Sequence, residues 1–151
     1  MKRGFTLLEL VIVIIIIGVL ATLGIQQYGR MVERARGAEA RTILGQIRST
    51  AAAHKLQYGC LDGTCGGNAP VFGLAEAGIG AAIDQIPSDC SLNTHYFSYT
   101  VAQTGQNSFI ATATRCTTGS GKTPGASTPF TLTLTTDFTN GTDVWGGSGG
   151  Y

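Results

Sequence analysis

Charged residues and histidines are scarce in this chain. Charged side chains make up 13% of its 151 residues, and the two histidines are His54 and His95. Nucleic-acid-binding proteins are usually rich in basic residues, and the overall composition of this chain is not of that kind. Neither histidine has a nucleophile or a carboxylate placed for a catalytic arrangement. The sequence therefore predicts a non-enzymatic protein with no catalytic residues, in which both histidines have structural roles.

A complete phosphate-binding loop is also missing. The segment TGSGKTP at residues 118–124 has the Gly-Lys-Thr end of that motif. The motif needs another glycine five residues before Gly121, where this chain has Cys116. Pro124 opposes the helix that should follow. We expect a solvent loop here, and no cofactor is predicted.

Two further patterns near the C-terminus have simple explanations. Asn140-Gly141-Thr142 matches a glycosylation acceptor, but Asn-Gly is also a strong tight-turn signal. Asp137 and Asp143 are a candidate calcium pair, although their spacing is not that of an EF-hand loop. We favour the turn, and no metal ligands are predicted.

Charge is distributed unevenly along the chain. Residues 26–58 carry six basic and two acidic side chains, whereas residues 59–151 carry two basic and six acidic ones. Regions of opposite charge attract each other, within one molecule or between copies. The alternative is an ordinary solvated surface, because exposed ion pairs contribute little to stability.

All four cysteines lie in the polar part of the chain: Cys60, Cys65, Cys90 and Cys116. An even number predicts two disulfides in an oxidising compartment. Cys60–Cys65 would enclose a tight turn, and Cys90–Cys116, the pairing we favour, would bracket a predicted hairpin. The rival interpretation is a zinc site that uses His54 or His95, but the spacing fits no common zinc pattern.

Residues 5–25 form one apolar run, FTLLELVIVIIIIGVLATLGI. As a helix it spans roughly 31 Å, the thickness of a bilayer core. A secretory signal peptide is one interpretation, with a basic start at Lys2 and Arg3 and a cleavage-like VLA at residues 19–21. An ordinary signal anchor is another, but it leaves Glu9 unexplained. Cleavage between Gly4 and Phe5, with the apolar helix retained, accounts for every feature.

That cleavage would place a new amino group four positions before Glu9. A carboxylate at the bilayer centre costs roughly 2.5–3.5 kcal/mol on insertion scales. Opposite charges ~4 Å apart attract by about 4 kcal/mol at an effective dielectric near 20. We therefore predict that Glu9 meets the ammonium group of Phe5, on its own helix or on a neighbouring copy. Between copies, such a buried charge would set the axial register of the helices.

The stretch RGFTLLELVIVIIIIGVLATLGIQQY resembles the N-terminus of type IV pilins and of the related pseudopilins of type II secretion. It has a short basic leader that ends in Gly4, then Phe5, Glu9 and a long aliphatic run that contains Gly18. The resemblance implies that a prepilin peptidase cuts after Gly4 and methylates the amine of Phe5. It also implies that Glu9 pairs with the amine of an adjacent subunit and that the helices bundle into a filament core.

The resemblance implies partners and a location as well. The partners are identical subunits in a homopolymer, the prepilin peptidase, the pilus assembly machinery and, before assembly, the inner membrane. No nucleic acid is predicted for the isolated subunit. The precursor would lie in the bacterial inner membrane and the mature protein in an extracellular surface filament. Counting the arginines after the apolar run would place the C-terminus inside, but the cysteines and the resemblance favour the outside.

One departure from the family pattern concerns the helix. Family members often have proline in the stretch where this chain has Gln26, with Gly24 just before it. Proline kinks a helix, whereas glycine weakens it by about 1 kcal/mol relative to alanine. The sequence therefore allows a kink or a melted segment near Gly18–Gly24 without requiring one.

Residues 26–58 are predicted to continue the helix, with an apolar stripe at Tyr28, Val32, Ala35, Ile43, Ile47, Ala51, His54 and Tyr58. Residues 59–94 are predicted to be a loop-rich connector with a short helix near 74–84. Strands are expected at 95–102, 108–114 and 129–136, followed by the Asn140-Gly141 turn and a flexible tail, WGGSGGY.

The predicted fold class is α+β, with a long N-terminal helix packed on a small antiparallel sheet and stapled by disulfides. The expected divisions are a leader at 1–4, a membrane and filament-core helix at 5–28, its amphipathic continuation at 29–58 and a β head at 59–151. We interpret the chain as a structural subunit of a type IV pilus. A pseudopilin or minor pilin, and a monomeric membrane-anchored binding module, are the alternatives. Motility, adhesion, DNA uptake and secretion are not distinguished.

Overall fold

A computed structural model describes residues 5–66, 69–73, 75–80, 86–91 and 94–149. It divides into two compact units, Met1–Ala35 and Arg36–Tyr151. One helix, α1 (Leu7–Tyr58), contributes to both units. Gly4 and the rest of the expected leader lie outside the described residues.

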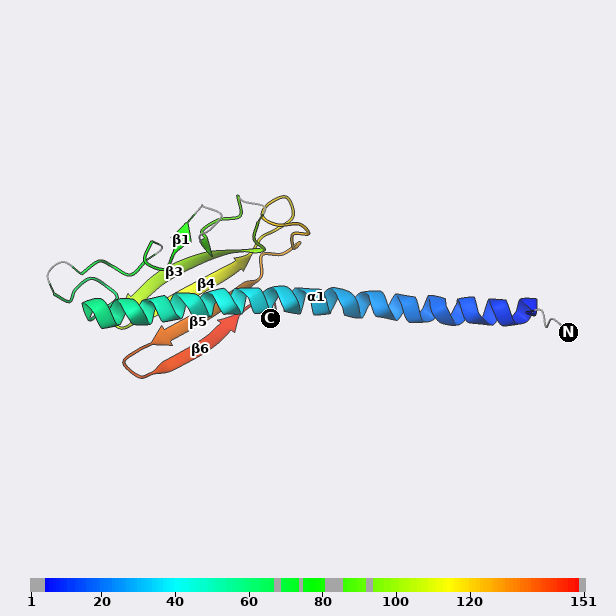
Figure 1. Ribbon diagram of the computed structural model, residues 1–151, viewed down its shortest axis with the longest axis horizontal. Coiled ribbons are helices and arrows are strands. Elements are labelled where there is room, and N and C mark those ends of the chain that lie inside the picture. The colour runs from blue at the N-terminus through cyan, green and yellow to red at the C-terminus, as the bar shows by residue number, and fades with distance from the viewer. Residues whose placement is uncertain (1–4, 67–68, 74, 81–85, 92–93, 150–151) are drawn as a thin grey trace. The chain divides into compact units, whose positions relative to one another are not determined.

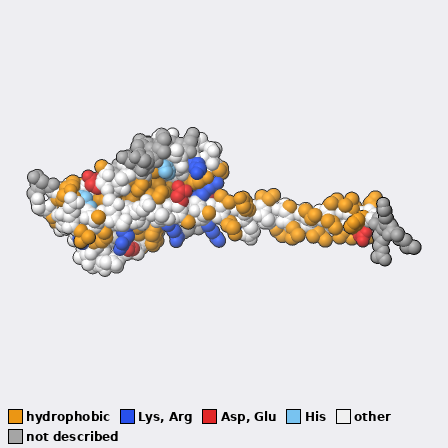
Figure 2. Space-filling view, in the orientation of Figure 1, with side chains coloured by type: hydrophobic (Ala, Val, Ile, Leu, Met, Phe, Trp, Pro, Cys, Tyr) orange, Lys and Arg blue, Asp and Glu red, His pale blue; other side chains and the backbone are white. Residues whose placement is uncertain are grey.

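The first unit is helical from Leu7 onward. Every residue from Phe5 to Met31 is exposed, including the whole apolar run. Figure 2 shows apolar side chains covering this part of the helix, with few charged ones among them. No described residue of this unit therefore covers its apolar surface.

The second unit packs the rest of α1 against a four-stranded antiparallel sheet (Figure 1). The strands are β3 (Phe97–Gly105), β4 (Ser108–Arg115), β5 (Thr131–Asp137) and β6 (Thr142–Gly147), in that spatial order. A short parallel pair, β1 (Ile79–Gly80) and β2 (Ile86–Pro87), lies in the connector. The predicted α+β class, a long helix with a small antiparallel sheet, is confirmed.

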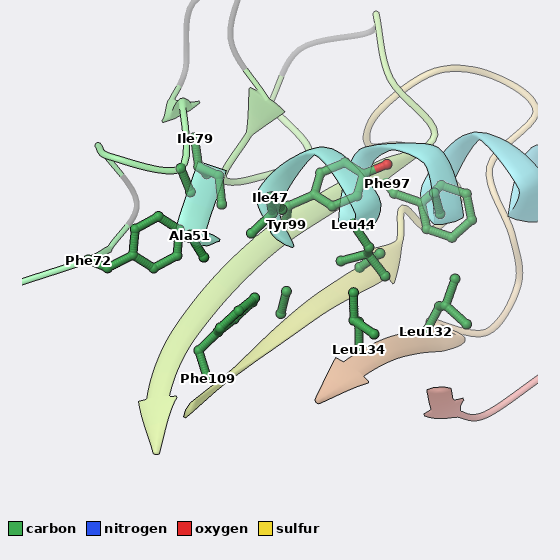
Figure 3. Packing of buried hydrophobic residues seen from close by; sticks show 14 of the residues in the cluster. Leu44, Ile47, Ala51, Phe72, Ile79, Phe97, Tyr99, Phe109, Leu132 and Leu134 are labelled. Atoms are coloured by element: carbon green, nitrogen blue, oxygen red, sulfur yellow. The ribbon is translucent and has the colours of Figure 1, made fainter. Parts of the chain in front are cut away.

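The core lies between α1 and the inner face of the sheet. Leu44, Ile47 and Ala51 on the helix are fully buried, as are Phe97 and Phe109 on the strands. Figure 3 shows the helix side chains pointing toward the strands. Burial alternates residue by residue along β4 and β5, because successive side chains of a strand point to opposite faces. This alternation is the pattern that predicted both strands.

The buried face of α1 differs from the predicted stripe, because Tyr28 and Ala35 are exposed and Val32 and Tyr58 are only partly buried. Ala40 and Leu44 are fully buried, whereas the predicted Ile43 is only partly so. Ile47, Ala51 and His54 are buried as expected. Ile43 and Leu44 are adjacent apolar residues, so the sequence alone does not show which of them is buried. Only the position of the sheet decides that Leu44 faces the core.

Two expectations outside the main helix are wrong. Residues 75–78, within the short helix expected near 74–84, form a turn that leads into β1, and residues 81–85 are not described. Trp145 to Gly147, expected in a flexible tail, belong to β6, where Gly147 has φ 127° and lies so near the Thr131 carbonyl that a Cβ would have no room. Glycine permits that close approach, so the same residues that suggested flexibility allow pairing with β5.

The connector also contributes to the core, which its loop-like composition did not indicate. Leu61 and Phe72 are fully buried. The Leu61 amide donates to the carbonyl of Gln106, and the Phe72 amide donates to the carbonyl of Leu61, each at 2.7 Å. The first part of the connector is therefore bound to the turn between β3 and β4.

Candidate functional site

The exposed apolar helix is the most unusual feature of the described chain. Phe5 is 90% exposed and Leu7 81% exposed, and aliphatic side chains continue exposed through Ile25. A continuous apolar surface of this kind marks contact with a membrane or with other protein chains. Among the described residues, α1 is the one helix long and apolar enough to cross a membrane by length and composition.

The start of α1 is closed by reciprocal hydrogen bonds between Thr6 and Glu9. The Thr6 hydroxyl oxygen accepts from the Glu9 amide at 3.3 Å. Glu9 Oε2 accepts from the Thr6 amide and from the Thr6 hydroxyl, each at 3.0 Å. This is a capping box, in which two amides that the helix leaves unpaired are satisfied by side chains.

The capping box gives Glu9 a role that the sequence reasoning missed. The expected charge pair does not include this role, although Thr-x-x-Glu before an apolar run is itself a helix-start signature. A carboxylate in the first turn also faces the partial positive charge of the helix N-terminus. Within the described residues, the hydrogen bonds to the Glu9 carboxylate all use Oε2.

The helix is unbroken through the two glycines that could have interrupted it. α1 runs from Leu7 to Tyr58 and includes Gly18 and Gly24. The Thr22 hydroxyl donates back to the Gly18 carbonyl at 2.6 Å. A methyl group at either glycine would meet nothing within 4 Å. Gly18 and Gly24 therefore neither kink nor interrupt α1, which contains no proline.

The predicted cleavage point is only partly described. Phe5 lies just before α1, without secondary structure, and Gly4 is outside the described residues. Their predicted roles in processing and methylation therefore stay predictions, as does the pairing of Glu9 with an amine of another subunit.

The favoured disulfide is present. Cys90 and Cys116 are bonded, with 5.7 Å between their Cα atoms. Beside it, the guanidinium of Arg115 is buried and donates to the carbonyls of Tyr96, Cys116 and Pro124. Cys60 and Cys65 are separate thiols in this structure.

The remaining candidate residues are not gathered into one site. His54 is 7% exposed, packs at an angle against the rings of Tyr58 and Phe72, and has no hydrogen-bond partner among the described residues. The described residues contain no group of three or more histidines, cysteines or carboxylates close enough to hold a metal. His95 contributes its backbone carbonyl to the Lys122 amide.

The sequence patterns near the C-terminus have structural explanations. In the Gly-Lys-Thr segment, the amides of Gly121 and Lys122 are used internally, by the carbonyls of Cys90 and His95, so they do not form an open anion cradle. Asp137 accepts from Asn140 and Thr139 in the turn before β6, and Asp143 accepts from Arg48 at 2.8 Å.

Comparison with known proteins bears on the N-terminal segment. The family described as the prokaryotic N-terminal methylation motif matches residues 1–25. Three relatives, each named type IV major fimbrial protein FimA and each from Dichelobacter nodosus, are 41% identical to the chain over 49 residues. The N-terminal segment is therefore similar to that of type IV fimbrial proteins. The predicted resemblance to the type IV pilin family is therefore confirmed.

The extent of the pilin match is limited. It covers 32% of this chain and 31% of each FimA relative, so the chain is aligned over about a third of their length. No solved structure matches the chain significantly. The pilin-type segment is thus supported by sequence similarity, whereas the sheet in the second unit is established by the structure alone.

Proposed function

We propose that this chain is the structural, non-enzymatic subunit of a type IV pilus. In this proposal a prepilin peptidase cuts the precursor between Gly4 and Phe5 and methylates the new amine of Phe5. The mature subunit then assembles with identical copies through its N-terminal helix. The observation that carries the proposal is the exposed apolar run at the start of α1, in a chain whose residues 1–25 match the methylation motif.

The apolar surface has two environments that fit it. Fully burying one Val, Leu, Ile or Phe side chain is worth about 1.5–3 kcal/mol, and the run from Phe5 to Ile25 exposes a large set of them. Lipid covers this surface in a membrane-anchored precursor, and neighbouring helices cover it in a filament. Transfer between these environments conserves burial, so assembly does not require the apolar segment to pass through water.

The capping box supports a specific part for Glu9 in this transfer. Thr6 holds Glu9 Oε2 at the start of the helix. The second carboxylate oxygen has no bond within the described residues, so it is open to an ammonium group. After cleavage, the amine of Phe5 on an adjacent subunit would supply that group. One charge pair per subunit would then fix the axial register, while apolar packing would supply most of the binding free energy.

The rest of the chain follows from this arrangement. Residues 1–4 would be the leader, 5–28 the membrane and filament-core helix, 29–58 its amphipathic continuation and 59–151 the outer β head. The precursor would lie in the inner membrane and the mature subunit in a surface filament. The assembly machinery and the prepilin peptidase would be its transient partners.

The test is intact mass and N-terminal analysis of the mature protein, with electron microscopy of the cell surface. We expect a start at methylated Phe5 and abundant filaments. Gly4→Glu should leave the precursor uncleaved and abolish filaments, whereas the matched Gly18→Ala, a change within the helix that meets no neighbour, should be processed normally.

Other outcomes would replace the proposal. A mature start near Thr22 would show that a secretory signal had been removed. Correct processing with only short periplasmic assemblies would favour a pseudopilin. Correct processing with no polymer would favour a monomeric anchored binding module.

A further inference from the structure

The segment that follows α1 is held in place on both sides. Gly59, with φ 90°, ends the helix, and its amide donates to the Lys55 carbonyl at 2.7 Å. A left-handed glycine in this position is a common helix C-cap. Two residues later, the Leu61 amide is bonded to the carbonyl of Gln106 in the turn between β3 and β4. The chain entering the segment therefore has little freedom.

A tight turn then reverses the chain between Cys60 and Cys65. Asp62 Oδ1 accepts from the Thr64 amide at 3.1 Å and from the Thr64 hydroxyl at 2.7 Å. Gly63 occupies the left-handed region with φ 76°. The Gln106 side chain donates to the Thr64 hydroxyl at 3.0 Å, which binds the turn to the sheet.

The turn brings the two cysteines into contact. The Cys65 amide donates to Cys60 Sγ at 3.0 Å. A hydrogen bond to the Cys60 side chain is the main cause that raises the pKa of the Cys65 thiol. Cys60 is fully buried, whereas Cys65 is partly exposed. The Cys65 thiol can therefore react with a reagent in solution, while the Cys60 thiol lies buried next to it.

We infer that Cys60 and Cys65 form a second disulfide, a modification site that locks the end of α1 to the turn at residues 60–65. The inference rests on the proposed function, which places residues 59–151 outside the inner membrane. Cys65 would attack the disulfide of an external oxidant, either a protein disulfide or oxidised glutathione, and release one thiol. Cys60 would then attack the mixed disulfide and release the second thiol. In sum, two protein thiols and one external disulfide become one protein disulfide and two external thiols.

The Cys60–Cys65 bond would covalently close the turn that follows the helix cap at Gly59. Leu61 and Thr64, inside the closed loop, are already bonded to Gln106. The new bond would therefore join the end of α1 to a turn that is fixed to the β3–β4 hairpin. Because the described geometry already brings the two thiols together, closure would need little movement of the sheet.

The test is disulfide mapping of the full-length protein, purified without reductant after free thiols have been alkylated in denaturant. An endoproteinase that cuts before aspartate separates Leu61 from Asp62, so only a disulfide can hold the Cys60 and Cys65 peptides together. We expect these peptides to be linked and to separate on reduction. Cys60→Ser should leave one thiol that alkylates, on Cys65. The Cys90–Cys116 bond serves as the internal control.

The outcomes separate this inference from the proposed function. Alkylated Cys60 and Cys65 with an intact Cys90–Cys116 bond would overturn the inference and leave the pilin proposal standing, and linkage of Cys60 to Cys90 or Cys116 would overturn it too. If all four cysteines were alkylated, the proposed compartment would be wrong. Incubation of the reduced protein with oxidised glutathione would then show whether Cys60 and Cys65 can form a disulfide. A linked pair would support the inference, and an unlinked pair would refute it.

Discussion

Thr6 precedes α1 and Thr22 lies within it, and the two use their hydroxyl groups in opposite ways. Thr6 caps the helix and accepts from the amide of Glu9, whereas Thr22 donates to carbonyls that the helix already bonds. Loss of an N-cap residue costs about 1 kcal/mol. A back-bonding threonine contributes little, and alanine is the better helix former.

Thr6→Ala should therefore loosen the first turn of α1. At about 1 kcal/mol, local opening should increase roughly fivefold, measured by hydrogen exchange of the Glu9 and Leu10 amides, which donate to Thr6, in detergent micelles. Thr22→Ala is the matched control and should leave exchange near residue 22 unchanged or slower. Equal effects of the two substitutions would show that the capping box does not stabilise the helix start.

Arg115 and Lys122 both lie over the ring of Tyr96, at 5.0 and 4.9 Å from its centroid, but their surroundings differ. Arg115 is 1% exposed and donates to three carbonyls, whereas Lys122 is exposed. Hydrogen bonds from a charged donor contribute about 1.5–3 kcal/mol each, and an exposed cation over a ring about 0.5–1 kcal/mol.

Arg115→Met should consequently lower the free energy of unfolding by at least about 2 kcal/mol. Lys122→Met should change it by no more than about 1 kcal/mol. Chemical denaturation of the detergent-solubilised chain would measure both. Comparable small losses would mean that the buried guanidinium does not organise the loop around the disulfide.

At the scale of elements, Arg48 on α1 is bonded to Asp143 on β6 at 2.8 Å. The hydrogen bond from Arg48 is the main cause that lowers the pKa of Asp143 below its ordinary value of 3.8. A carboxyl whose pKa is lower in the folded state stabilises the fold above the unfolded pKa and loses that contribution as pH falls through the folded one. The side chains are 41% and 31% exposed, so the contribution is at most about 1 kcal/mol.

Asp143→Asn should therefore destabilise the protein slightly at pH 7 and have little effect at a pH well below the folded pKa of Asp143. Other carboxyls, such as Asp89 and Asp137, also have lowered pKa values, so the informative quantity is the difference between variant and wild type. Denaturation at both pH values, with Arg48→Gln and the double variant, isolates the pair. A cost that persists in acid would assign the effect of Asp143 to packing rather than to charge.

The elements that the sequence predicted well are those with local signals. The alternation of residues 108–114 identifies β4, because Phe109, Ala111 and Ala113 all face the core, and the Asn140-Gly141 turn appears with Gly141 at φ 65°. The missed features depend on distant contacts. Phe72 is buried only because the connector folds onto the core, and Arg115 is buried beside a loop whose Pro124 carbonyl accepts from its guanidinium.

At the scale of the whole molecule, the candidate site also has some features that the sequence predicts and others that it does not. The length and apolarity of residues 5–25 and the motif around Glu9 are readable from the chain, and the pilin resemblance follows from them. The Thr6–Glu9 capping box is an equally local feature, because Thr-x-x-Glu before an apolar run predicts it. Contacts between copies are not encoded in one chain's geometry, so the role of Glu9 in assembly requires an experiment.

Glu9→Gln separates the two roles of this side chain. Glutamine can accept the same amide bond in a capping box, so the start of α1 should remain as protected from hydrogen exchange as in the wild type. It carries no charge, so it cannot form the ion pair with the Phe5 ammonium of another subunit. We expect membrane insertion and processing to be normal and filaments, counted by electron microscopy, to be lost.

Glu9→Ala completes the comparison, because it removes both the cap and the charge. If the charge pair governs assembly, the glutamine and alanine variants should both lack filaments, while only the alanine variant should show a frayed first turn. If the glutamine variant assembled normally and the alanine variant did not, Glu9 would act in assembly by ending the helix correctly. The ion pair between subunits would then have to be abandoned as the source of axial register.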